Sequence, residues 1–170
     1  MKLKKILVLA LLALGIFGGC LKGGVAEVSK LEFKLDDGNV PEQYYSEVQM
    51  TVVPDYEKRT LTVDYSRVFP KRTAETVDED IQIKGVTIGG ENFERFLKSV
   101  DYVTKFKSEE AIVEEDAKAI FYARAYPLGD GEPQVVAVNW NSEGSADEDL
   151  EALKSFYLDV ANLLTENEPV

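Results

Sequence analysis

Alternation of apolar and polar residues recurs along the first half of the chain and constrains its fold more than any other feature. The stretch LEFKLD, residues 31–36, has an apolar residue at every second position and a charged residue after each one. Successive side chains of a strand point to opposite faces, so this pattern predicts a sheet that is apolar on one face only. Strands are expected over residues 31–36, 47–52, 61–66 and 81–88, with an extension of the third as far as Phe69 left open. A bulge or bend is expected at Gly85.

The spacing of apolar residues changes after Gly89 and Gly90. Residues 91–106 carry phenylalanine, leucine and valine at intervals of three and four, which predicts an amphipathic helix. Its first turn is acidic and its last turn is basic, as the helix dipole favours. The following segment, residues 108–118, fits either one more helical turn or an acidic loop.

The second half of the chain predicts a hairpin and a second helix. Strands are expected over residues 119–126 and 135–140, joined by a turn in the sequence PLGDGEP. The sequence SADE then fits a capping box, with Ser145 at the cap and Glu148 at the third helical position. The apolar stripe of this helix comprises Leu150, Leu153, Tyr157, Val160 and Leu164. We therefore predict an α+β fold in which an antiparallel sheet of about six strands, ordered β-β-β-β-α-β-β-α, has two helices packed on one face.

The N-terminal segment has the layout of a secretory signal. Three lysines within residues 2–5 precede an apolar run, Ile6 to Phe17, that is too short to cross a bilayer as a helix. The sequence FGGC at its end resembles the lipobox of prokaryotic lipoproteins and departs from it at Phe17, where an aliphatic residue is usual. The resemblance implies that Cys20 receives a diacylglyceryl group, becomes the mature N-terminus and holds the protein at the extracytoplasmic face of the cell membrane. The alternatives are an uncleaved signal anchor and a plain secretory signal with an incidental cysteine.

Three regions follow from these patterns. Residues 1–19 form the signal peptide, residues 20–30 hold the lipidated cysteine and a flexible tether, and residues 31–166 form a single α+β domain. The chain is rich in glutamate and lysine and poor in methionine, glutamine and cysteine. That balance favours a hyperthermophile source, for example an archaeon.

Composition narrows the chemistry that this domain can perform. The chain has no histidine and a single cysteine, so catalysis by a Ser-His or Cys-His pair and zinc binding by Cys and His are excluded. Without the signal lysines, 16 basic residues stand against 31 acidic ones, and the net charge of −15 repels nucleic acid. We therefore expect no cofactor, no metal ion and no nucleic acid partner. The function favoured is a non-catalytic domain that binds an envelope protein or a ligand, and the alternative is a hydrolase or carbohydrate-active protein that uses two carboxylates.

Aromatic residues supply the candidate ligand site. On the predicted strand 119–126, Tyr122, Arg124 and Tyr126 share the face opposite to Phe121. A cation between two phenols can hold an anionic or planar ligand by stacking and hydrogen bonding. The alternative is a cross-strand ladder in which Arg124 pairs with a carboxylate of the neighbouring strand and the phenols pack along its stem.

The hairpin suggests a third function. Residues 121–140 and the capped helix that follows are similar in layout to emfourin-type inhibitors of thermolysin-family proteases, over about a third of the mature chain. The resemblance implies an envelope protease inhibitor, for which PLGDGEP is the candidate inhibitory loop, and it carries over no individual residue.

Overall fold

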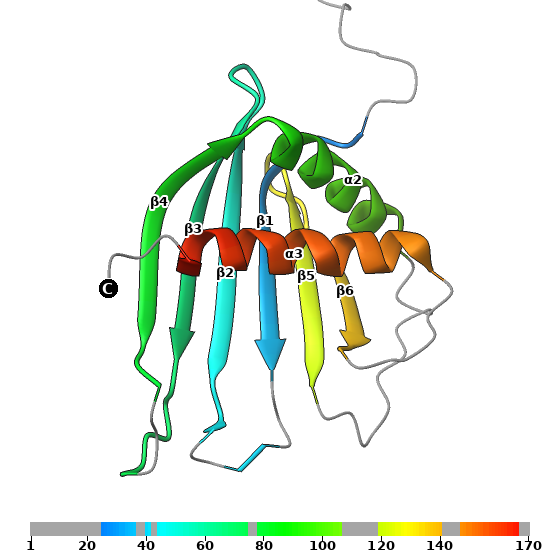
Figure 1. Ribbon diagram of the computed structural model, residues 1–170. Coiled ribbons are helices and arrows are strands. Elements are labelled where there is room, and N and C mark those ends of the chain that lie inside the picture. Colours follow the sequence, from blue (N-terminus) through cyan, green and yellow to red (C-terminus); the bar gives the residue numbers. More distant parts are fainter. Residues whose placement is uncertain are drawn as a thin grey trace, which may run out of the picture.

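A computed structural model of the chain describes residues 25–36, 40–41, 44–74, 78–106, 119–140 and 147–166. Six strands form one sheet in the order β4-β3-β2-β1-β5-β6 (Figure 1). Every neighbouring pair is antiparallel. The strands are β1 (Val28–Asp36), β2 (Glu47–Asp55), β3 (Thr60–Val68), β4 (Ile81–Gly89), β5 (Ile120–Pro127) and β6 (Gln134–Asn139).

Two helices, α2 (Glu91–Lys105) and α3 (Glu148–Glu166), lie on the same face of this sheet (Figure 1). The side chain of Arg95 on α2 bonds Asp159 on α3 at 2.7 Å and joins the two helices at their exposed side. The element order and the one-sided packing confirm the α+β fold expected from the sequence.

The core lies between the sheet and the helices. Leu31 and Phe33 of β1 are fully buried there, because the alternation of the strand points them toward the helices. The rings of Phe33, Phe121 and Tyr157 form one cluster, with centroids 5.4–5.8 Å apart. The stripe predicted for the last helix is buried in full: Leu150, Leu153, Tyr157, Val160 and Leu164.

Two boundaries differ from those expected. Strand β1 begins at Val28, so residues 28–30, expected in the tether, belong to the sheet. Helix α3 begins at Glu148, so the capping box at Ser145 is wrong, and Ser145 itself lies outside the described residues. The carboxylate of Asp147 instead accepts from the backbone N–H of Asp149 at 3.0 Å and of Leu150 at 3.1 Å. Asp147 is therefore the N-cap, and the negative charge also suits the positive end of the helix.

Strand β4 contains the bulge expected at Gly85. The pairing of β3 with β4 shifts between Val63 and Tyr65, and Gly85 has a φ of 68°. This left-handed conformation carries no steric penalty only for glycine. The backbone N–H of Gly85 donates to Asp64 Oδ1 at 2.7 Å, so the bulge has a side-chain partner in β3.

Candidate functional site

The sheet face opposite to the helices is called the open face here. None of the described helices or strands lies on it (Figure 1). Its side chains come from the charged and polar positions of the alternating strands, which point away from the core. The strand register groups them into rows across the sheet, because residues opposite one another on paired strands have neighbouring side chains.

Strand β5 carries the predicted ligand-binding residues on the open face. Phe121, Ala123 and Ala125 are buried toward the helices. Tyr122, Arg124 and Tyr126 alternate with them, and the two tyrosines are half-buried while Arg124 is exposed. The expected placement of the three residues on one outward face is therefore correct, whereas ligand binding there stays a prediction.

The neighbouring strand β1 completes a group that we call the Tyr-Arg cluster: Lys30, Glu32, Tyr122, Arg124 and Tyr126. Tyr126 lies opposite Lys30, and Arg124 lies opposite Glu32. Glu32 accepts a hydrogen bond from Lys30 Nζ at 2.5 Å and another from the Tyr126 hydroxyl at 2.7 Å. The Lys30 ammonium also lies 4.1 Å from the centre of the Tyr126 ring. The cluster is thus ordered around one carboxylate.

These contacts shift the ionisation of the groups involved. Partial burial by itself would raise the pKa of Glu32, but the hydrogen bonds from Lys30 and Tyr126 and the charges of Lys30 and Arg124 outweigh it and lower the pKa. The hydrogen bond with Glu32 raises the pKa of both Lys30 and Tyr126. At neutral pH Glu32 is therefore charged, Lys30 is protonated and Tyr126 keeps its proton as a donor.

Arg124 is held differently from Lys30. Its guanidinium carbon lies 6.0 Å from the centre of the Tyr122 ring, and within the described part of the chain no carboxylate oxygen lies within 4.0 Å of its nitrogens. Glu32, opposite Arg124, already binds Lys30 and Tyr126. The arrangement combines features of both hypotheses. Tyr126 joins a cross-strand ladder through Glu32, and the charge of Arg124 also acts on Glu32. The exposed guanidinium can still bind an anion.

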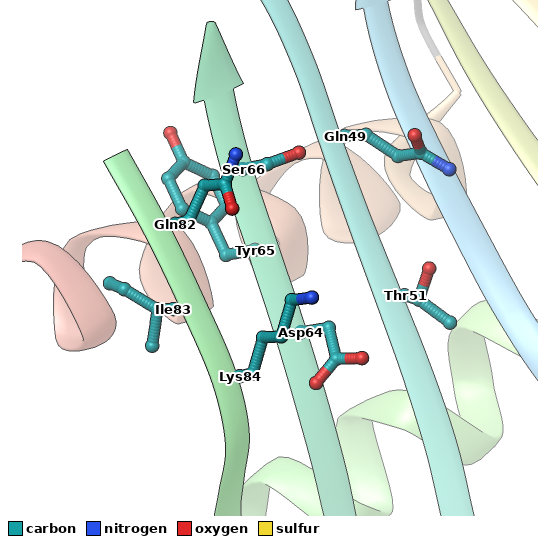
Figure 2. A pocket seen from close by; sticks show the side chains of 8 residues that line it. All are labelled: Gln49, Thr51, Asp64, Tyr65, Ser66, Gln82, Ile83 and Lys84. Atoms are coloured by element: carbon teal, nitrogen blue, oxygen red, sulfur yellow. The ribbon is translucent and has the colours of Figure 1, made fainter. Parts of the chain in front are cut away.

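A shallow groove of about 300 Å³ lies on the same face, over β2, β3 and β4 (Figure 2). This volume is at the lower end of the range for small-molecule pockets. The groove is lined by Gln49, Thr51, Asp64, Tyr65, Ser66, Gln82, Ile83 and Lys84. Figure 2 shows Gln49 and Thr51 on one side of the groove and Lys84 and Gln82 on the other, with Asp64 and Ser66 between them.

The polar groups of the groove face solvent with little internal bonding. Gln49, Ser66 and Gln82 lie side by side in register across three strands. Within the described residues, no hydrogen bond or ion pair engages the side chains of these three or of Thr51 and Lys84. Asp64 is the exception, because it accepts from the bulge at Gly85. The groove therefore offers amides, hydroxyls, one carboxylate and one ammonium to a ligand.

The turn of the β5–β6 hairpin is exposed. Leu128 keeps 58% of its surface accessible. Gly129 has a φ of 96°, and a side chain at Gly131 would meet the Pro127 ring at 2.6 Å. Both glycines are thus needed for the shape of this turn, one for its dihedral angle and one for close packing.

Metal binding and two-carboxylate hydrolysis both depend on groups of acidic side chains. Across the described ranges, no three Cys, His, Asp or Glu side chains are grouped to hold a metal ion. Asp64 is the only carboxylate among the lining residues of the groove, so the groove does not provide the carboxylate pair that the hydrolase hypothesis needs. The lipidation site predicted at Cys20 lies outside the described residues.

In the described part of the chain, neither helix combines the length and the apolar character needed to span a membrane.

Comparison of the chain with family models, with curated proteins and with solved structures gives no match to any of them. A functional assignment therefore depends on the geometry of the open face.

The groove was not anticipated from the sequence. Alternation predicted that Gln49 and Ser66 share the polar face of their strands, but not that they would be neighbours or that Gln82 would join them. One signal was available in the sequence. The outward positions of β1 from Lys30 to Asp36 are all charged, whereas Gln49, Ser66 and Gln82 place amides and a hydroxyl at the outward positions of their strands.

Proposed function

We propose that this protein is a lipid-anchored, extracytoplasmic binding domain without catalytic activity, and that its open face is the ligand-binding surface. The observation that carries the binding role is Arg124, an exposed cation between two tyrosines with no ion-pair partner among the described residues. It lies on a face that the described helices leave uncovered (Figure 1). The anchor is supported by the signal-like segment and the FGGC sequence.

The anchor is tested by Cys20→Ser in the full chain. This change removes the thiol that would carry the lipid, so we expect the protein to leave the membrane fraction while the wild type stays in it. Retention of the variant after a carbonate wash contradicts lipid anchoring and indicates an uncleaved signal anchor instead.

The binding role is tested by crosslinking in native membranes with wild type and Arg124→Ala. We expect the variant to lose the crosslinked product while its melting temperature stays within about 2 °C of the wild type, the range usual for surface changes. Lys98→Ala is the matched control, because it removes an exposed cation from α2 on the other side of the molecule. A variant that keeps the product but loses stability contradicts the proposal and identifies Arg124 as part of a structural ladder.

A second candidate function, inhibition of a secreted metalloprotease, is favoured by one observation. Leu128 projects at 58% exposure from a turn held between Pro127 and Pro133. An exposed apolar residue on a short, proline-flanked loop is suited to insertion into the pocket of a protease. We expect the wild type to inhibit thermolysin and the Leu128→Asp variant to lose this inhibition. If the wild type does not inhibit thermolysin at micromolar concentration, this candidate function is contradicted.

A further inference from the structure

We infer that the open face binds an oligosaccharide that carries a carboxylate group, with the acidic sugar at the Tyr-Arg cluster and hydroxyl-rich rings over the groove. This inference rests on the proposed function and names the chemical class of its ligand.

The groove and the Tyr-Arg cluster form one continuous surface. Strand β1 lies between them and contributes Lys34, which is opposite both Gln49 of β2 and Tyr122 of β5. One row of registered side chains therefore runs from β4 to β5, and a second runs from β3 to β5. The first row is Gln82, Ser66, Gln49, Lys34 and Tyr122. The second row is Asp64, Thr51, Glu32 and Arg124, and Lys84 of β4 lines the groove next to it at the bulge, where the pairing of β3 with β4 shifts.

The length of these rows points to an extended ligand. Neighbouring strands lie about 4.8 Å apart, so the four spacings from β4 to β5 cover about 19 Å. A single sugar ring would reach only one part of this surface. A chain of several rings, lying across the strands, can contact the groove and Arg124 together.

Hydrogen-bonding capacity favours sugars over other extended ligands. Each sugar hydroxyl both donates and accepts, and the groove offers both functions through the amides of Gln49 and Gln82 and the hydroxyls of Thr51 and Ser66. On the far side of β1 from the groove, the half-buried ring of Tyr122 provides a flat surface for the apolar side of a sugar ring. A peptide strand, in contrast, gains most from pairing with a sheet edge, and these groups lie on the face.

Charge favours an acidic ligand. The two rows together with Lys30 and Lys84 hold four cations and two carboxylates, and Asp36, which pairs with Lys34 at 3.8 Å, adds a third carboxylate. This surface therefore keeps a small excess of positive charge in a chain of net charge −12. Glu32 and Asp64 are already engaged by Lys30, Tyr126 and Gly85, whereas Arg124 has no carboxylate partner in the described structure. A ligand carboxylate can therefore bind the guanidinium by two parallel hydrogen bonds. The acidic remainder of the surface disfavours polyanions such as nucleic acid.

The test measures binding of the full-length chain, in detergent, to three probes. These are aldotetraouronic acid, which carries one glucuronic acid on three xylose rings, neutral xylotetraose, and an acidic peptide of equal charge. We expect the acidic saccharide to bind about tenfold more tightly than the neutral one, because it adds a charged hydrogen bond. Equal affinity for the two saccharides, tighter binding of the peptide, or no saccharide binding overturns the inference.

Two variants locate the site. Arg124→Ala should reduce the affinity for the acidic saccharide to that of the neutral one, and Gln49→Ala with Gln82→Ala should weaken both by about tenfold. Asn162→Ala, which removes an exposed amide from α3, is the control and should change neither. Binding that survives in both site variants overturns the inference.

A crosslinking arm separates this inference from the proposed function. A photoreactive residue replaces Val135, which is 38% exposed and lies opposite Arg124, and a control variant carries the same photoreactive residue in place of Leu158 on α3. A saccharide adduct specific to position 135 supports the inference. A protein adduct at that position overturns the inference and leaves the proposed binding role standing, whereas identical products at both positions contradict the proposed role itself.

Discussion

Replacement of Leu153 by alanine measures how firmly α3 is docked on the sheet. Leu153 is 1% exposed and lies in the core between the sheet and the helices. The change removes three buried carbons, which cost about 2.4 kcal/mol at about 0.8 kcal/mol each. Incomplete collapse of the cavity adds to this, and the total expected loss of unfolding free energy is about 3–4 kcal/mol. For a chain of this size, a loss of about 3 kcal/mol lowers the melting temperature by about 6–12 °C.

The assay is urea unfolding of the full chain followed by circular dichroism, with Leu158→Ala as the matched control. Leu158 lies on the same helix but is 42% exposed, so its truncation should cost less than about 1 kcal/mol. A loss below about 0.5 kcal/mol for Leu153→Ala, or equal losses for both variants, would show that α3 does not pack on the sheet as described.

Three further changes test individual contacts. Asp147→Ala should cost about 1 kcal/mol of unfolding free energy by removing the N-cap of α3, and Asp147→Asn should restore most of it; equal losses in both variants would argue against capping. Gly85→Ala should cost about 1–2 kcal/mol because it forces a Cβ into the left-handed conformation of the bulge, and an unchanged urea midpoint would contradict that strain. The pKa of Glu32 is lowered in the folded state, so its stabilising contribution is present above the ordinary value near 4.5 and is lost as the pH falls through the lowered pKa. The stability difference between wild type and Glu32→Gln should therefore shrink on acidification across that window, and a pH-independent difference would refute the assignment.

Elements with a strong period could be predicted from the sequence. The alternation in LEFKLD identified the faces of β1 correctly, because burial of Leu31 and Phe33 requires the charged residues to point outward. Gly85 was identified for a similar reason, since a glycine inside an alternating strand has little to contribute except an unusual backbone conformation.

The N-cap residue of α3 could not be predicted from the local sequence pattern alone. Both Ser145 and Asp147 are good N-cap residues, and the sequence SADE favours the first by its spacing to Glu148. In the structure Asp147 caps the helix and Leu150 lies at its third position. The first residue of the helix depends on how α3 packs against the core. A four-residue motif carries no information about that packing.

The open face was predictable only in part. The outward direction of Tyr122, Arg124 and Tyr126 followed from the burial of the residues between them. That Glu32 is the carboxylate of the cluster could not be predicted in this way. It depends on the pairing of β1 with a strand about ninety residues further along the chain. The groove depends on three registers at once, and neighbours on different strands cannot be assigned from alternation alone.

The position of β1 in the middle of the sheet has a mechanical consequence. The chain enters the fold at Val28, and β1 is hydrogen-bonded to β2 on one side and to β5 on the other (Figure 1). A force that reaches the domain through the residues before Val28 therefore pulls along a strand held by two ladders, whose bonds must shear together. A strand at the edge of the sheet would peel from a single neighbour under the same force. The domain should therefore withstand a larger force applied through the residues before Val28 than it would if its first strand lay at the edge of the sheet.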